Sequence, residues 1–179
     1  MTTISSSSSK IRMSQEPNQD SSNSLLPKSA EVERLLTEVK QLLAKNEPKA
    51  ALALITRSRL ASAWLTNAAG VCNLRLNHVA TAMGMFRNLV LSRIGITLRD
   101  DIPIVFKANF ATALLLSNNL SGCQEVLAEI HDQHPAGARL SEAIHRFTKN
   151  LTRWQMTCWY LGFVPHVVLP ADFQPGDID

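Results

Sequence analysis

The chain has 179 residues, of which 45% are hydrophobic and 18% are charged, and its formal net charge is +3. This composition suffices for one hydrophobic core and excludes a wholly disordered or collagen-like chain. Few glycines and a single tyrosine favour a mostly helical domain over a mostly β one.

The sequence also bears on location and cofactors. No run of about 18 apolar residues is present, so we expect no membrane insertion. The first 13 residues lack the charged and apolar blocks of a secretory signal. Cys72, Cys123 and Cys158 are far apart within apolar stretches, which disfavours disulfides and a zinc site. We therefore expect a cytoplasmic protein without a metal or another cofactor.

Composition divides the chain into four parts. Residues 1–28 are rich in Ser, Asn, Gln and Pro, which predicts a disordered N-terminal stretch. Residues 29–135 and 136–164 carry helical periodicity, first in short segments and then in one long one. Residues 165–179 contain three prolines and one glycine, which predict an extended, acidic C-terminal arm.

The helices expected in chain order follow the apolar spacing. The first runs from Ser29 to just before Asn46, and the second begins at Pro48. Three more cover 63–76, 78–93 and 104–117, and a sixth runs from Ser121 to just before Pro135. The last, at 138–161, has a continuous apolar stripe formed by Leu140, Ile144, Phe147, Leu151, Trp154, Cys158 and Leu161. Short links between the helices predict antiparallel neighbours.

Three helix pairs share one spacing. Steps of twelve and then four residues lead from Gly70 to Ala82 and Phe86, and the same steps start from Ala111 and from Val39. Small residues at the first two positions allow two backbones to approach, and a large third residue fills the space beside them. The members of the other two sets are Ala111, Cys123 and Leu127, and Val39, Ala51 and Ile55.

This spacing resembles the tetratricopeptide repeat (TPR) family over residues 31–135. The resemblance implies an all-α fold: a short α-solenoid of three antiparallel helix pairs with a long C-terminal capping helix. The sequence departs from the family at Asn73, where an aromatic residue is usual, and in its unequal repeat intervals, which predict an inserted loop at 95–103. A generic helical bundle is the alternative.

The resemblance implies a non-catalytic protein-protein interaction module, an adaptor or scaffold. Its partner would be another protein, of which a peptide or helix binds in the concave groove. The positions that face the groove in the family correspond here to Lys40, Leu43, Trp64, Asn67, Val71, Arg75, Asn109 and Thr112. The family's clamp for terminal carboxylates is absent, because Leu36, Lys40, Ala68, Val105 and Asn109 occupy its positions.

Each groove residue also has a structural interpretation. Trp64 is either an exposed anchor or a contact that joins two helix pairs. Asn67 and Asn109 either bind a ligand backbone or bridge neighbouring helices. Lys40 and Arg75 either meet carboxylates or are simply solvated, and the second reading is favoured.

The arm differs in charge from the rest of the chain. Residues 29–164 contain 15 basic and 10 acidic side chains, whereas residues 165–179 contain Asp172, Asp177 and Asp179 and no base. We therefore expect the arm to lie against the helices, either in the groove as a pseudo-ligand or elsewhere as a brace. Its attachment after the last helix favours a brace near the last helix pair.

Two other classes of function are weaker. His131, His134 and Cys123 have no acidic partner at a metal-binding spacing, and no catalytic motif is present, so we expect no enzyme. A basic helical nucleic-acid-binding protein is the alternative function, suggested by Arg139, Arg146, Lys149 and Arg153. The small net charge and the lack of a stacking platform disfavour nucleic acid. Self-association is left open.

Overall fold

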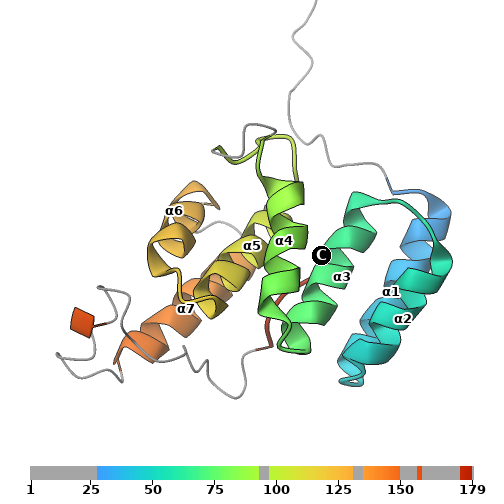
Figure 1. Cartoon of the computed structure of the whole chain (residues 1–179), viewed down its shortest axis with the longest axis horizontal. Coiled ribbons are helices and arrows are strands. Elements are labelled where there is room, and N and C mark those ends of the chain that lie inside the picture. The colour runs from blue at the N-terminus through green and yellow to red at the C-terminus, as the bar shows by residue number, and fades with distance from the viewer. Residues whose placement is uncertain (1–27, 93–96, 131–134, 150–156, 159–173, 179) are drawn as a thin grey trace, which may run out of the picture.

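A computed structural model describes residues 28–92, 97–130, 135–149, 157–158 and 174–178. These residues form seven named helices and no strand, which confirms the all-α class (Figure 1). The helices are α1 (Ala30–Ala44), α2 (Pro48–Ser58), α3 (Ala63–Arg75), α4 (Val79–Val90), α5 (Ile104–Leu116), α6 (Leu120–Ile130) and α7 (Pro135–Lys149).

The helix starts follow from local chemistry. The Ser29 hydroxyl accepts a hydrogen bond from the Val32 N–H at 3.3 Å, and Ser62 accepts one from Trp64 at 3.3 Å. Each serine thus satisfies one of the N–H groups that a helix start leaves unpaired. Pro48 occupies the first turn of α2, where a missing N–H has no cost.

The same turn closes the first helix of each pair. Asn46, Asn77 and Asn118 have positive φ angles of 59°, 60° and 66°. The Asn46 N–H binds the Leu43 carbonyl at 3.1 Å, the next N–H binds the Leu42 carbonyl at 2.9 Å, and both bonds recur at the other two turns. This is the Schellman motif, in which asparagine tolerates the left-handed conformation. The intervals between these asparagines, 31 and 41 residues, match those of the repeated small-residue spacing.

Helices pack against their neighbours along the chain and also against their second neighbours. Each consecutive pair from α1·α2 to α6·α7 is in contact. In addition, α1 contacts α3, α3 contacts α5, and α5 contacts α7. The odd-numbered helices therefore form a connected row, and Figure 1 shows α3, α4 and α5 in the middle of the molecule.

The close approach of α3 and α4 depends on Gly70. A Cβ atom built on Gly70 would lie 2.6 Å from two ring carbons of Phe86, closer than real Cβ contacts come. Six members of the repeated spacing have no exposed surface: Val39, Ala51, Ala82, Phe86, Ala111 and Cys123. The spacing found in the sequence thus marks the place where α3 and α4 meet, and it marks buried small residues in the other two pairs.

Helices α3 and α5 are buried on all sides. Ten of the 13 residues of α3 and eleven of the 13 of α5 are buried, including the polar residues Asn67, Asn73, Lys107, Asn109 and Thr112. A helix covered on every face shows no clear apolar stripe in its sequence. These two helices are consequently the ones that can bring polar side chains into the interior.

The link between α4 and α5 is longer than the other turns, as expected. Leu91 and Leu98 form an isolated antiparallel bridge. The Ser92 N–H binds the Thr97 carbonyl at 2.9 Å, and the Arg99 N–H binds the Val90 carbonyl at 2.9 Å. The residues between Ser92 and Thr97 lie outside the described part of the chain.

Helix α7 begins three residues before the expected start, because Pro135 fits the first turn of a helix. Its Leu140 and Ala143 are buried, and α7 contacts α5 and α6. The predicted extension beyond Lys149, the N-terminal stretch before Lys28 and most of the arm lie outside the described residues. Among the helices that are described, none is long and apolar enough to cross a membrane.

Candidate functional site

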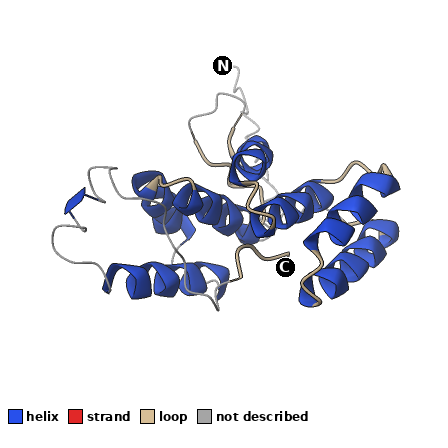
Figure 2. Ribbon diagram, turned by 60° about the horizontal axis from the view of Figure 1, so that its bottom comes forward, coloured by secondary structure: helices blue, strands red, loops and turns tan. Residues whose placement is uncertain are grey.

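Residues 174–178, the last part of the chain that is described, lie against α3, α5 and α7. Figure 2 shows this segment, close to the label C, between the first helix pair and α7. The side chains that contact it, which we call the tail site, are Asn67, Val71, Arg75, Asn109 and Arg139.

Asn109 binds both main-chain groups of Asp177. Its Nδ2 donates to the Asp177 carbonyl at 2.6 Å, and its Oδ1 accepts from the Asp177 N–H at 2.8 Å. The Nδ2 also donates to Oδ1 of Asn67 at 2.9 Å, and Asn67 Nδ2 lies 3.4 Å from the same carbonyl. Both asparagines are buried, with exposed fractions of 0% and 1%, so their amides need such partners.

Arg75 joins the segment to the first helix pair. Its Nε lies 3.4 Å from the Pro175 carbonyl, and one terminal nitrogen donates to the Leu43 carbonyl of α1 at 3.1 Å. Burial lowers the pKa of Arg75, while the nearby Cys72 and Asp177 act in the opposite direction. Arg75 therefore binds main-chain oxygens of two segments and is not simply solvated.

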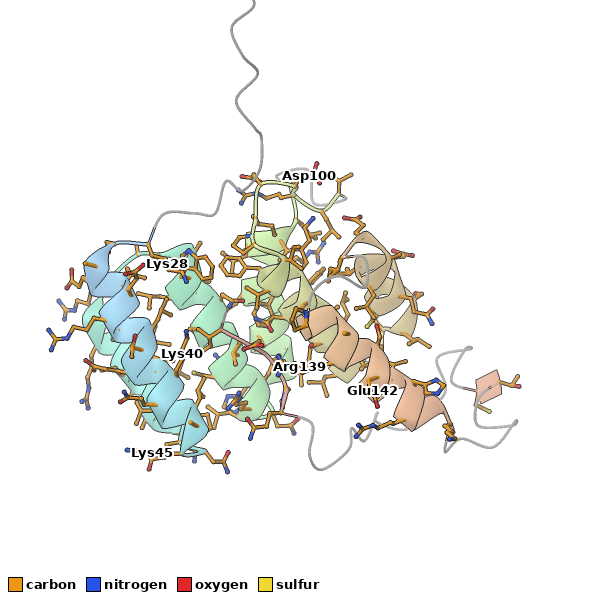
Figure 3. All side chains as sticks on the ribbon, turned by 180° about the vertical axis from the view of Figure 1, so that it is seen from behind. Lys28, Lys40, Lys45, Asp100, Arg139 and Glu142 are labelled. Carbon is orange, nitrogen blue, oxygen red and sulfur yellow. The ribbon has the colours of Figure 1, made fainter. Side chains whose placement is uncertain are left out.

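Asp177 adds an ion pair at the rim of the site. Its carboxylate pairs with the Arg139 guanidinium of α7, whose side chain is 62% exposed (Figure 3). The second carboxylate oxygen accepts the Ile178 N–H at 2.9 Å. The side chain thus fixes its own main chain while it contacts α7.

The two residues that flank Asp177 fit against buried surface. Gly176 has a φ of +81°, and a Cβ atom there would lie 2.9 Å from a methyl group of the buried Val71. Ile178 is 4% exposed and belongs to the same hydrophobic core as the helices. The segment is therefore packed as well as hydrogen-bonded.

Four residues predicted for the groove, Asn67, Val71, Arg75 and Asn109, contact the segment. The favoured expectation for the arm was a brace near the last helix pair, and the other was a pseudo-ligand in the groove. Residues 174–178 contact α5, the first helix of that pair, and α3 at positions that the resemblance assigns to the groove, and they also contact α7.

Trp64 lies in the core and is not an exposed anchor. Its ring is 5.0 Å from that of Phe106 in an edge-on arrangement, and the residue is 5% exposed. The Lys28 ammonium lies 3.6 Å from the centre of the Trp64 ring. Trp64 thus joins α3 to α5, which was the alternative interpretation of this residue.

Three groove candidates remain, Leu43, Thr112 and Lys40. Leu43 is buried and contributes only its carbonyl, through Arg75. Thr112 is buried, and its hydroxyl donates to the Ala108 carbonyl of the same helix at 2.9 Å. Lys40 is half-buried on α1 (Figure 3).

Arg139 was missed as a site residue. In the sequence it belongs to a row of basic residues on α7, which reads as the solvated face of an amphipathic helix. Two members of that row are paired in the structure, Arg139 with Asp177 and Arg146 with Glu142. The acidic composition of the arm is the one sequence signal that could have suggested the first pair.

Neither of the two buried thiols is an activated nucleophile. Burial raises the pKa of Cys72 to about 11 and that of Cys123 to about 12, so both are protonated at neutral pH. Within the described part of the chain, no three His, Cys, Asp or Glu residues are grouped as metal ligands would be.

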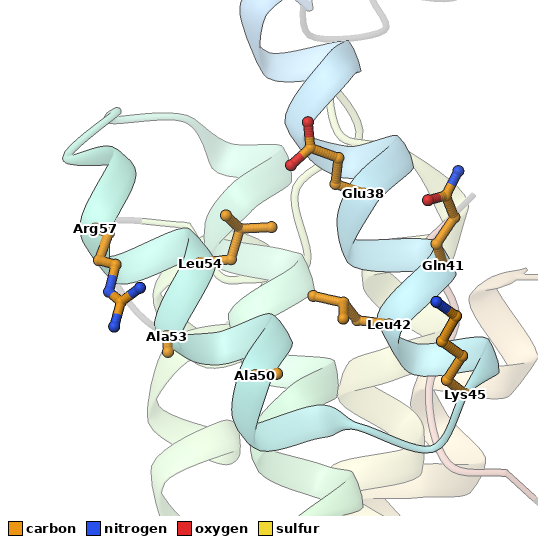
Figure 4. Close-up of a pocket in the computed structure, with 8 residues that line it drawn as sticks. All are labelled: Glu38, Gln41, Leu42, Lys45, Ala50, Ala53, Leu54 and Arg57. Carbon is orange, nitrogen blue, oxygen red and sulfur yellow. The ribbon is translucent and has the colours of Figure 1, made fainter.

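A hollow of about 480 Å³ lies between α1 and α2 (Figure 4). Leu42 and Leu54 face one another across it, and the charged side chains of Glu38, Lys45 and Arg57 stand around them. This hollow shares no residue with the tail site.

Comparison with known proteins adds no relative: no family model matches the chain, and neither a curated protein nor a solved structure matches it.

Proposed function

We propose that this chain is a non-catalytic protein-interaction module, a TPR-like adaptor, that binds an extended peptide of a partner protein at the tail site. The observation that carries the proposal is the pairing of Asn109 with both the N–H and the carbonyl of Asp177. Main-chain groups are common to all peptides, so this pairing can hold another segment in the same way.

The site is already arranged for an extended main chain. Asn109 and Asn67 come from α5 and α3, and the bond between their side chains fixes the orientation of both amides. Arg75, fixed by the Leu43 carbonyl, offers a further donor to the carbonyl of Pro175, two residues before Asp177. Donors held in place before binding lose little conformational entropy when a peptide arrives.

The helix arrangement supports the TPR-like α-solenoid that accompanies this function. The odd-numbered helices contact one another in order, three turns repeat the same asparagine motif, and the small-residue spacing marks the crossing of α3 and α4. In a solenoid the first helices of successive pairs line one surface, which is where Asn67 and Asn109 occur.

The test uses the full chain with its own segment released. The substitution Asp177→Pro removes the N–H that binds Asn109 and also the carboxylate that pairs with Arg139. A fluorescent peptide with the sequence of residues 170–179, blocked at both ends, is then titrated against this variant. We expect saturable binding, which Asn109→Ala weakens at least about tenfold because it removes two hydrogen bonds and leaves buried groups unpaired.

Asn73→Ala is the matched control. Asn73 is also a buried asparagine, but its amide donates to the Ala69 carbonyl within α3. Its loss should leave peptide affinity within about twofold if circular dichroism shows both variants folded. Absence of peptide binding, or equal binding with and without Asn109, would contradict the proposed function.

A further inference from the structure

We infer that the tail site selects a three-residue pattern in its partner: a glycine, then an acidic residue, then an aliphatic residue. The inference rests on the proposed function and names the chemistry of its ligand. Residues 176–178, which read Gly-Asp-Ile, occupy three positions that differ in what they allow.

The first position excludes any side chain. Gly176 combines a φ of +81° with a Cβ direction that points at Val71, where the three nearest atoms are 2.9–3.3 Å away. Val71 has no exposed surface and cannot move aside without disturbing the core. An L-residue would therefore suffer both backbone strain and overlap.

The second position favours a carboxylate. Asp177 pairs with Arg139, and its other oxygen accepts the N–H of Ile178. Arg139 is largely exposed, so its contribution to affinity is modest and decreases with salt. The charge at this position therefore contributes more to the discrimination between peptides than to the binding affinity.

The third position requires an aliphatic side chain. Ile178 is 4% exposed and is part of the main hydrophobic core. A polar side chain there would lose this burial and would place a hydroxyl or an amide among apolar groups. Gln174, two residues before Gly176, is exposed and gives no comparable selection.

The test extends the titration of the full-chain Asp177→Pro variant to a set of peptides. Relative to the parent peptide, Ala for the glycine and Ser for the isoleucine should each weaken binding at least about 30-fold. Asn for the aspartate retains the acceptor for the next N–H and should weaken binding about two- to fivefold.

Protein variants then assign each preference to its contact. Val71→Ala should reduce the preference for glycine over alanine, because it removes the methyl groups that the new Cβ would meet. Arg139→Gln should abolish the preference for Asp over Asn. Arg146→Glu, two turns further along α7, should leave that preference intact.

The outcomes separate the two proposals. If the parent peptide binds and the Ala or the Ser peptide binds with the same affinity, the pattern is overturned and the proposed function still stands. Absence of binding by every peptide would overturn both. A wild-type dimer that Asp177→Pro dissociates would overturn the assignment to a partner protein, because a second copy would then supply the segment.

A measurement within the wild-type chain keeps the inference testable without peptides. Hydrogen exchange at the Asp177 amide should become at least about tenfold faster in Gly176→Ala and in Ile178→Ser, because both release the segment. It should remain unchanged in Gln174→Ala. Equal exchange in all four proteins would overturn the inference.

Discussion

At the scale of single residues, Asn67 and Asn109 stand out because they place amides inside helices that are otherwise covered by apolar side chains. Buried amides destabilise the folded state unless each of their donors and acceptors has a hydrogen-bond partner. Here the two side chains bind one another and the main chain of Asp177. Their placement favours one occupant geometry, an extended main chain with both polar groups facing α5.

Gly70 provides a prediction about packing. Gly70→Ala adds a methyl group 2.6 Å from the buried Phe86 ring, and we expect it to lower the free energy of unfolding by about 1–3 kcal/mol. Gly84→Ala, in the exposed face of α4 with no atom near its Cβ, should raise that free energy by up to about 1 kcal/mol. Urea denaturation of both variants checks the prediction, and similar changes in both would contradict it.

The buried thiols predict a loss of stability at high pH. The usual pKa of a cysteine is 9.0, and burial raises that of Cys72 to about 11 and that of Cys123 to about 12. Above pH 9 the unfolded chain therefore loses these protons before the folded one does, and the unfolded state gains stability. Each thiol should lower the free energy of unfolding by about 2 kcal/mol between pH 8 and pH 10.5.

Other groups titrate in the same range, so the measurement compares variants. Urea denaturation under reducing conditions should show a weaker pH dependence in Cys72→Ala and in Cys123→Ala than in the wild type. Between pH 7 and pH 8, the free energy of unfolding should change with pH to the same extent in all three proteins. Parallel stability curves up to pH 10.5 would show that the thiols are not the cause.

At the scale of elements, the three asparagine turns are the most regular feature of the chain. Each reverses the chain after the first helix of a pair with the same two hydrogen bonds. Because the second helix of the pair starts directly afterwards, the geometry of the turn sets how that helix packs. The motif supplies a repeat signal that does not depend on the core residues.

Asn77 allows that role to be measured, because it is exposed and its side chain is free to change without loss of packing. Asn77→Ala should lower the free energy of unfolding by about 1 kcal/mol, since alanine is strained at a φ of 60°. Asn77→Gly should match the wild type or exceed it slightly. Thermal denaturation of the two variants provides the comparison, and equal melting temperatures would contradict the prediction.

Much of the helical architecture could be predicted from the sequence. Helices α3 and α5 begin at the expected residues, Ala63 and Ile104, because serine and proline mark their starts. The repeated spacing predicted the contact of Gly70 with Phe86, although Asn46 and the two equivalent asparagines were overlooked as repeat markers. The reason is that a left-handed turn residue carries a weak composition signal by itself.

The tail site was predictable only in part. Asn67 and Asn109 were candidates because of the family resemblance, but the same reasoning selected Trp64 and Thr112, which are core residues. When a helix is buried on all sides, periodicity cannot say which face meets a ligand. Arg139 has no local signal, because its partner lies 38 residues away, and only the acidic composition of the arm pointed to the pair.

At the scale of the whole molecule, the proposed function implies that the 174–178 segment competes with a partner peptide for the tail site. A tethered segment has an effective concentration of the order of millimolar, whatever the amount of protein. A partner must therefore bind tightly enough to displace the tethered segment, or bind while the segment is released. The apparent affinity for a partner is reduced by the fraction of sites that remain occupied.

This competition predicts a difference between two full chains. Asp177→Pro should bind the peptide of residues 170–179 at least about tenfold more tightly than the wild type, because its own segment no longer occupies the site. Gln174→Ala, which changes an exposed residue of the same segment, should bind like the wild type. Fluorescence polarisation gives both affinities, and equal values for Asp177→Pro and the wild type would mean that the segment does not compete.

The order of the contacts along the chain has a consequence for protein synthesis. Arg139, the last residue of the tail site, precedes Asp177 by 38 residues. At about 5–20 residues per second, the ribosome adds Arg139 about 2–8 s before the segment that fills the site, and it adds Asn67, Arg75 and Asn109 earlier still. On the proposed function, a partner already present near the ribosome binds a vacant site, whereas a later partner must first displace the segment. The timing of translation would then help to decide which of the two occupies the molecule.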